Sequence, residues 1–259
     1  MRKNNVKRAL AAGDVALGTM AFEFAATALA PLAADAGADF VIYDMEHTGW
    51  TIETMRTLMA TARGSDLVPA VRVPVTEYHF IARALDVGAM GIMVPMVESV
   101  EQGRRIVECA KYPPDGKRGT AFTVAHDNYT GGDVGEKIRA ANDEGLVIAQ
   151  IESVDGLDAV DDIAAVEGVD VLWIGHYDLT TSMGIPGEFG HVRYKDAVER
   201  VLNACAAHGK APGFMAGSVE QGRTLIEQGF RCLAYSRDSV LYRDALADGI
   251  AGLRGHATQ

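Results

Sequence analysis

The chain has few cysteines, and it contains no long apolar run. Its three cysteines, Cys109, Cys205 and Cys232, are odd in number and lack the spacing of a disulfide framework or a metal site. We therefore expect reduced thiols in a cytoplasmic protein. No apolar run approaches the length of a membrane span, and the basic start of the chain lacks the apolar core of a signal peptide, so secretion is not expected.

The chain also has too little positive charge for a polyanionic partner. It has 24 lysine and arginine residues against 35 aspartate and glutamate residues, which gives a net charge of -11 at pH 7. Nucleic acid and anionic membrane surfaces repel an acidic chain of this kind. We expect neither of them as a partner.

What the sequence does contain is a repeated unit, in which a short β-rich run is followed by a turn and a longer helical pattern. Eight runs are predicted strands, at residues 15–22, 38–45, 67–73, 89–97, 146–151, 169–175, 211–215 and 231–235. Helical periodicity lies between them, for example at residues 52–62, 78–87, 100–110, 157–166, 194–207 and 219–228. Eight strands alternating with helices through right-handed crossovers predict an α/β fold, the (β/α)8 or TIM barrel.

An open, doubly wound sheet is the competing architecture. It is disfavoured because the units are evenly spaced and no Gly-x-Gly-x-x-Gly turn follows any predicted strand. No linker or shift in composition divides the chain, so residues 1–259 are expected to form one barrel domain, which is a common size for this fold. The one long irregular stretch, residues 112–135, has a length that usually indicates a functional or disordered loop.

Acidic side chains follow two successive predicted strands. Glu152 ends the run LVIAQIE, and Asp178 follows the strand predicted at residues 169–175. In a (β/α)8 barrel the carboxyl ends of the strands surround the mouth where catalysis takes place. A hard divalent cation binds carboxylate oxygens and leaves positions for water and substrate. The two acids are therefore a candidate metal site, although acids also occur after strands without any such role.

His47 and Arg72 also fall at this predicted mouth, whereas Asp86 does not. His47, three residues after Asp44, could be a general base tuned by a carboxylate, because imidazole titrates near neutrality; a histidine that merely caps the next helix is the alternative. Arg72 has apolar neighbours in its strand, and a buried guanidinium needs an anionic partner, either an internal acid or a ligand carboxylate. Asp86 lies at a predicted helix end, where an ion pair between elements is the favoured interpretation.

Six stretches, in this order, resemble the HpcH/HpaI aldolase family, whose members are class II, metal-dependent pyruvate aldolases of the kind that cleave 4-hydroxy-2-oxo acids. They are YDMEH at 43–47, AVR at 70–72, LDVGA at 85–89 leading to VPM at 94–96, YPPDGKRG at 112–119, QIE at 150–152, and GVD at 168–170 with IGHYDL at 174–179. The similarity runs from about residue 18 to residue 253. Six motifs in family order are far more specific than any one of them.

The resemblance implies a metal-dependent aldolase that cleaves or forms 4-hydroxy-2-oxo acids, with pyruvate or hydroxypyruvate as the enolate component and an aldehyde as the acceptor. It implies a divalent cation, Mg, Mn or Co, held by Glu152 and Asp178. Arg72 would stabilise the enolate, and His47, oriented by Asp44, would transfer protons through water. Oxaloacetate decarboxylation is an expected side activity. The substrate-binding residues implied are Gln150, Gly175, His176, Tyr177 and Met215.

Relatives of this kind are described as hexamers whose last helix swaps between subunits, which implies the same for residues 239–253. The chemistry of the residues agrees with a metal mechanism. Enolate charge can be offset by a metal and an arginine, or avoided through a lysine Schiff base. All seven lysines fall outside the predicted strands and their mouths, which removes the nucleophile for the second route.

Two departures from the family pattern concern the aldehyde. His176 and Tyr177 replace the usual small residues after Gly175, and residues 120–129 differ from the arginine-bearing loop of the dicarboxylate-cleaving members. If His126 takes the place of that arginine, a short polar or neutral aldehyde is expected in place of a long acidic one.

Two other functions remain open at this point. A citrate-lyase-like enzyme acting on a coenzyme A thioester would share the barrel and the acid pair, but it needs basic residues for the nucleotide phosphates. The chain offers no cluster beyond Lys111, Lys117 and Arg118. A non-catalytic barrel that binds a 2-oxo acid is the other alternative, which the presence of acid, base and arginine together disfavours.

Overall fold

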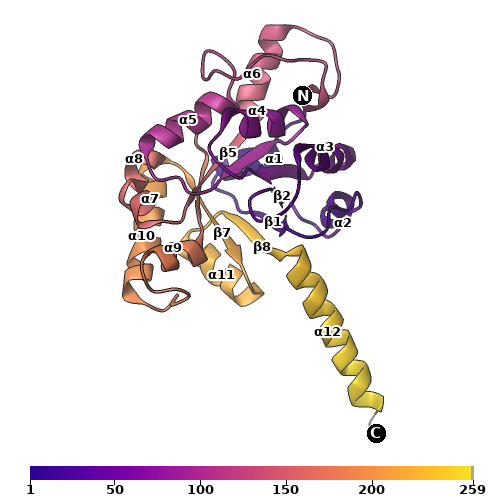
Figure 1. The fold of residues 1–259 in the computed structure, drawn as a ribbon, viewed down its shortest axis with the longest axis vertical. Helices are drawn as coiled ribbons and strands as arrows, with labels where there is room; N and C mark the ends of the chain where they lie inside the picture. The colour runs from indigo at the N-terminus through magenta and orange to yellow at the C-terminus, as the bar shows by residue number, and fades with distance from the viewer. Residues whose placement is uncertain (258–259) are drawn as a thin grey trace.

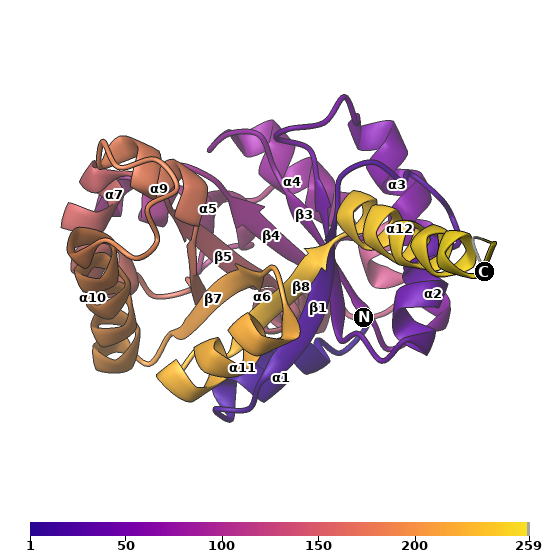
Figure 2. The same cartoon turned by 90° about the horizontal axis from the view of Figure 1, so that it is seen from below.

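Eight parallel strands close into a barrel in chain order (Figures 1 and 2). The structure is a computed structural model that describes residues 1–257, so the last two residues of the expected domain lie outside the described range. The strands are β1 (Ala16–Ala21), β2 (Phe40–Asp44), β3 (Val68–Arg72), β4 (Gly91–Val94), β5 (Leu146–Ile151), β6 (Val171–Ile174), β7 (Ala211–Ala216) and β8 (Cys232–Arg237). Pairing of β1 with β8 closes the ring and confirms the predicted TIM barrel.

Helices surround this ring. The longer ones are α3 (Ile52–Thr61), α4 (Tyr78–Asp86), α5 (Val100–Ala110), α6 (Val134–Glu144), α10 (Val192–His208), α11 (Val219–Gln228) and α12 (Asp238–Ala257). The shorter ones are α1 (Asn5–Ala11), α2 (Leu29–Asp35), α7 (Val154–Asp158), α8 (Val160–Ala164), α9 (His176–Ser182) and two 3₁₀ turns, η1 (Ala62–Gly64) and η2 (Ala125–Asp127). Several begin at a serine, such as Ser99 before α5 and Ser218 before α11, whose hydroxyl accepts a hydrogen bond from a free N–H of the first turn.

The two faces of each strand bury different parts of the core. Side chains alternate along a strand, so Ile42 and Ile148 point into the barrel while Val41 and Val147 pack under the helices. Both faces are therefore apolar, as expected for a parallel sheet covered by helices. The same alternation carries the inward face of each strand up to the mouth, where polar residues replace the apolar ones.

The observed elements differ from the predicted ones in a few places. The helix predicted at residues 157–166 is two short helices, α7 and α8, which meet at Ala159. Helices α1, α2, α6 and α9 lie outside the ranges given above as examples of helical periodicity. The irregular stretch at residues 112–135 contains η2 and the start of α6, and the buried Asp127 organises it by accepting hydrogen bonds from the N–H groups of Thr123, Val124 and Tyr129.

The last helix, α12, extends away from the barrel body (Figure 1). Its base is fixed, because the Asp238 carboxylate accepts hydrogen bonds from the N–H groups of Phe22, Glu23 and Phe24 in the loop after β1. Beyond this base, residues 242–256 are all exposed. Across residues 1–257, no helix combines the length and the apolar character that a membrane span requires.

Candidate active site

Asp44 and Arg72 end neighbouring strands and form a buried ion pair. The register of β2 and β3 places the two residues opposite each other, and Arg72 Nε lies 2.5 Å from Asp44 Oδ1. Both continue the inward faces of their strands, after Ile42 and Ala70. The internal acid that the sequence left open as a partner for Arg72 is therefore Asp44.

Asp44 also holds the turn that follows β2. Its two carboxylate oxygens accept hydrogen bonds from the backbone N–H groups of Glu46 (3.1 Å) and His47 (3.0 Å). The expectation that Asp44 orients the His47 imidazole needs correction, because Asp44 contacts the His47 backbone. The nearest carboxylate to the ring is that of Glu46, whose Oε2 lies 3.7 Å from His47 Nε2, and the His47 side chain is 56% exposed.

Glu46 is a site residue that the sequence analysis did not single out. Burial raises the pKa of its carboxyl to about 7, against the opposing effect of Arg72, and the neighbouring charges of Asp44 and Asp178 raise it further. Arg72 Nη1 lies 3.1 Å from Glu46 Oε2. The residue follows a strand end next to a histidine, but nothing in the sequence indicates that its carboxylate is half-buried.

Arg72 keeps one donor free. Its Nε and Nη1 face Asp44 and Glu46, and its guanidinium lies over the Phe22 ring at 5.3 Å. Within the described residues, 1–257, its buried Nη2 has no hydrogen-bond partner. Buried polar groups are nearly always paired in proteins, so an orphaned donor at a barrel mouth marks the position of a ligand acceptor.

Glu152 is held rigidly just after β5. Its Oε1 accepts a hydrogen bond from the Met96 N–H (2.7 Å), and its Oε2 accepts one from the Gln150 side-chain amide, whose own oxygen is buried without a partner. Burial raises the pKa of Glu152 to about 7, and the charges of Glu46 and Asp178 contribute to the increase. Gly175 allows this packing, since a Cβ there would collide with the Glu152 carboxylate.

Asp178 approaches the same place from a helix. β6 ends at Ile174, and α9 begins at His176, so Asp178 is exposed in the first turn of α9 and does not extend a strand. Three carboxylates therefore lie near one another at the mouth, because the charge of Asp178 raises the pKa of both Glu46 and Glu152. No three His, Cys, Asp or Glu side chains of residues 1–257 have the geometry of a complete metal site. A cation here would depend on one or two acids together with water and substrate.

The donor set fits such a cation. Carboxylate oxygens are the ligands that hard dications prefer. Glu152 and Asp178 provide them beside a third acid, Glu46, and the charge of Arg72 is already shared between Asp44 and Glu46. Burial raises the pKa of Glu152, the negative charges of Glu46 and Asp178 raise it further, and a bound dication would offset that negative charge.

Aromatic side chains line the adjoining cavity, which has a volume of about 630 Å³ and includes Met215 of β7 and Arg237 of β8. The His176 ring stacks on Phe214, with ring centroids 4.7 Å apart, and Tyr177 packs edge-on against Phe189. Burial lowers the pKa of His176 to about 4, so this imidazole is neutral at pH 7. The predicted substrate residues His176, Tyr177 and Met215 thus face one cavity.

His126 lies elsewhere. It lines a second cavity, beside the amino-terminal ends of β4 and β5, at the opposite end of the barrel from the carboxylates. The hypothesis that His126 takes the place of an arginine beside the substrate is therefore wrong within one subunit, because His126 does not reach the mouth of its own barrel. The interpretation of Asp86 as an ion-pair residue is confirmed, because its Oδ1 lies 2.5 Å from Arg118 Nη2.

Comparison with known proteins identifies the family. The family model described as HpcH/HpaI aldolase/citrate lyase matches residues 20–245. The chain belongs to this family. It is 34% identical to a hydroxypyruvate/pyruvate aldolase from Roseovarius nubinhibens over 97% of both chains, and 34% identical to a 5-keto-4-deoxy-D-glucarate aldolase from Shigella sonnei over 93% of both chains.

Among solved structures, an HpcH/HpaI aldolase from Desulfitobacterium hafniense superposes with a TM-score of 0.91 at 31% identity, covering 96% of each chain. These relatives confirm the resemblance seen in the sequence and identify an HpcH/HpaI enzyme of the carbon–carbon lyase type, with a metal-dependent aldolase mechanism supported at the level of the family.

Replacing Glu46 by glutamine is expected to flatten the pH dependence of stability. The Glu46 carboxyl, with an ordinary pKa of 4.5, keeps its proton up to about pH 7 in the folded protein. The unfolded chain releases that proton near pH 4.5. Stabilisation present below pH 4.5 is therefore lost as the pH rises toward 7, by on the order of 1–3 kcal/mol. Urea unfolding in metal-free buffer between pH 4.5 and 7.5 measures the slope.

The control is Glu101→Gln, which alters an exposed acid in the first turn of α5 and should leave the slope unchanged. Equal slopes in the wild type and in Glu46→Gln would contradict the raised pKa of Glu46.

Proposed function

We propose that this HpcH/HpaI enzyme cleaves or forms 4-hydroxy-2-oxo acids at the mouth of the barrel, with pyruvate or hydroxypyruvate as the enolate component. The observation that carries the proposal is the orphaned, buried Arg72 Nη2 beside the carboxylates of Glu46, Glu152 and Asp178. An anionic or carbonyl oxygen is the partner that this donor lacks. The names of the two aldolase relatives support the substrate class.

Glu152 and Asp178 would hold the divalent cation, Mg, Mn or Co. When bound, the cation supplies Lewis acidity that polarises the carbonyl and offsets the enolate charge. Gln150 holds the Glu152 carboxylate, and Gly175 leaves room for it. These two residues keep the carboxylate in one position, as a cation with strict geometry requires.

Arg72 would bind the keto oxygen through Nη2, and its position is fixed by Asp44. A donor that is already aimed at the developing charge needs no reorganisation during the reaction. His47 would move protons at the edge of the mouth, where its exposed ring reaches water and Glu46 lies 3.7 Å away. Asp44 serves this step indirectly, because it holds the backbone of His47.

The aldehyde would occupy the cavity between His176, Tyr177 and Met215. Its aromatic walls favour an apolar or uncharged chain, whereas Arg237 on the same cavity could bind a terminal carboxylate. The reason for preferring a short neutral aldehyde, which depended on His126, no longer holds. The substrate panel below therefore includes both kinds.

A coenzyme A thioester is less well supported. The basic residues that might bind its phosphates, Lys111, Lys117 and Arg118, contact Asn142, Glu108 and Asp86 respectively. Lys111 and Arg118 lie at the end of the barrel opposite the carboxylates. A turnover assay distinguishes the aldolase from a non-catalytic protein that binds a 2-oxo acid, because only the aldolase releases product.

We also propose that the domain formed by the chain assembles into a hexamer in which α12 packs on a neighbouring subunit. Tyr242, Leu246, Ile250 and Leu253 follow one another at helical spacing, and each is at least 41% exposed. An isolated helix with an uncovered apolar stripe is poorly stable in water. A cytoplasmic location is supported by the three cysteines, which are all buried and unpaired.

The first prediction of this proposal is metal-dependent pyruvate release. Glu152→Gln and Asp178→Asn should each lower kcat/KM by on the order of 100-fold or more, and Arg72→Met should do so even at saturating metal. The assay measures pyruvate released from a panel of 4-hydroxy-2-oxo acids, acidic and neutral, with and without chelator. Activity that persists after chelation and in Glu152→Gln would exclude the metal mechanism, and metal binding without turnover of any substrate would favour a binding protein.

The second prediction concerns proton transfer. His47→Ala should slow the exchange of pyruvate methyl protons with solvent by about 100-fold or more, because the exposed imidazole is the proposed carrier. Metal affinity should change little, since His47 is not a proposed ligand. Proton NMR in deuterated buffer follows the exchange, and His79→Ala, at an exposed position on α4, is the control. Unchanged exchange in His47→Ala would remove this residue from the proton pathway.

The third prediction concerns assembly. Replacing Leu246 and Leu253 by glutamate should reduce the mass measured by light scattering after gel filtration from a hexamer to smaller species, because the charges prevent burial of the stripe. Asp248→Lys, a change elsewhere on the exposed part of α12, should leave the mass unchanged. A hexamer that survives both glutamates would show that α12 is not an intersubunit contact.

A further inference from the structure

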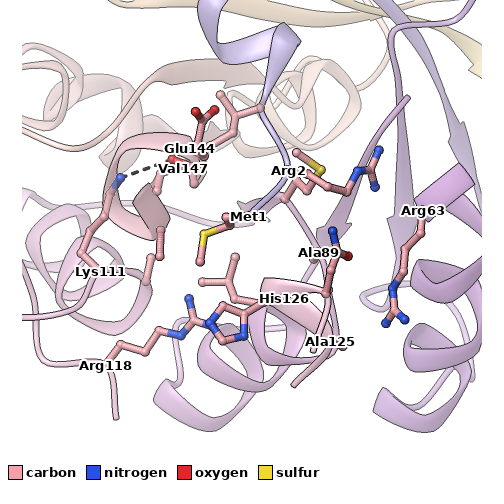
Figure 3. A pocket seen from close by; sticks show the side chains of 18 residues that line it. Met1, Arg2, Arg63, Ala89, Lys111, Arg118, Ala125, His126, Glu144 and Val147 are labelled. Atoms are coloured by element: carbon pink, nitrogen blue, oxygen red, sulfur yellow. Dashed lines mark hydrogen bonds between the residues drawn. The ribbon is translucent and has the colours of Figure 1, made fainter. Parts of the chain in front are cut away.

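The second cavity, at the amino-terminal end of the barrel, has the features of a ligand site (Figure 3). Its volume is about 50 Å³, and it lies between the first residues of β5 and the segment at residues 110–128, which begins at the last residue of α5. Met90, Leu146 and Val147 give it apolar walls. A space of this size holds about three or four water-sized groups. That matches a small polyatomic ion better than a metabolite of the size of an aldol product.

Arg118 is built into the wall of this cavity. Its side chain is only 4% exposed, its Nη2 pairs with Asp86, and its guanidinium lies over the Tyr112 ring at 4.6 Å. These contacts fix the guanidinium, but the buried Nε–H has no hydrogen-bond partner among residues 1–257. A charged donor that is held in place and left unpaired indicates a missing acceptor.

His126 supplies a second orphaned nitrogen. Its Nε2 lies 3.2 Å from the Tyr112 hydroxyl, and its ring stacks on Phe122, while the buried Nδ1 has no hydrogen-bond partner in the described part of the chain. Burial and the charge of Arg118 lower the pKa of His126 to about 4, so the ring is neutral at pH 7. When Tyr112 donates its hydroxyl proton to Nε2, the proton of the neutral ring resides on Nδ1. Figure 3 shows the His126 and Arg118 side chains close together at this cavity.

The side chains that line the cavity carry more positive than negative charge, which also favours an anion. Among residues 1–257, four basic residues line it, Arg2, Arg63, Lys111 and Arg118, of which Arg118 is paired with Asp86; the acid in the lining, Glu144, is paired with Arg8. Lys111 is 5% exposed, and its ammonium donates a hydrogen bond to the backbone carbonyl of Asn142. No acid of residues 1–257 forms an ion pair with it. The molecule as a whole carries a net charge of -11, so a cluster of four bases, two of them buried, is a local exception.

We propose that this cavity binds a small anion, either a short carboxylate or an inorganic oxyanion, at a site separate from the barrel mouth. Arg118 Nε and His126 Nδ1 donate hydrogen bonds to the anion, and the basic side chains around it supply the balancing charge. The apolar wall formed by Met90, Leu146 and Val147 receives the methyl group of a carboxylate such as acetate. The bound anion joins the segment at residues 110–128 to the beginning of β5.

Isothermal titration with acetate, inorganic phosphate and neutral acetamide tests the proposal on the full-length protein. We expect saturable binding of acetate or phosphate with a Kd on the order of 1 mM, and none of acetamide. Binding of acetate alone identifies the ligand class as a carboxylate, and binding of phosphate alone identifies an inorganic oxyanion. Equal binding of acetamide, or no saturable binding of either anion, would overturn the proposal.

Variants assign the binding to this cavity. His126→Phe keeps the ring and removes the donor, and Ala125→Val fills the space from a residue that lines it; each should weaken binding at least tenfold. His79→Phe, at an exposed site, should not, and Glu152→Gln should leave anion binding intact because it alters only the mouth. Circular dichroism establishes that each variant is folded. An unchanged Kd in both His126→Phe and Ala125→Val, or loss of binding in Glu152→Gln, would place the anion elsewhere.

Discussion

The ion pair between Asp44 and Arg72 joins the carboxyl ends of β2 and β3, and the geometry of the mouth depends on it. One Asp44 carboxylate contacts the guanidinium and also the two N–H groups that begin the turn carrying Glu46 and His47. Burying such a pair is costly, and removing one partner leaves a buried charge without compensation. The pair nevertheless has a use at the mouth. The contacts of Arg72 with Asp44, Glu46 and Phe22 fix its guanidinium, so that the remaining nitrogen, Nη2, is held where a substrate oxygen would lie.

The mouth differs electrostatically from the rest of the molecule. Elsewhere, buried acids have partners that stabilise the carboxylate: Asp127 pairs with Lys137, 2.6 Å away, and Asp238 accepts hydrogen bonds from three backbone N–H groups. At the mouth, burial and the charge of Asp178 raise the pKa values of Glu46 and Glu152, the charge of Glu46 adds to the increase at Glu152, and Arg72 opposes the increase at Glu46. Such an arrangement lowers stability unless a ligand balances it. An excess of negative charge of this kind is expected at a site that binds a cation. A purely structural ion-pair network would instead balance its acids with bases.

The sequence could predict the barrel because each strand is apolar on both faces and the units repeat evenly. It could also predict which residues reach the mouth, since Gln150 and Glu152 continue the inward alternation of Leu146 and Ile148. It could not predict contacts that depend on tertiary packing. The partner of the His47 ring, the burial of Glu46, and the helical position of Asp178 each follow from how a loop or helix lies after its strand.

The position of His126 is a second feature that the sequence could not predict. Residues 112–135 could belong to either end of the barrel as far as composition tells, and the ion pair of Arg118 with Asp86 fixes part of this stretch beside the end of α4. β5 then separates two polar sites: Leu146 and Val147 line one cavity, and Gln150 and Glu152 reach the other. Six residues of strand span about 20 Å, so a ligand at one end cannot touch the other. Two sites of opposite charge preference can therefore coexist in one acidic chain, because the apolar barrel interior keeps their charges apart.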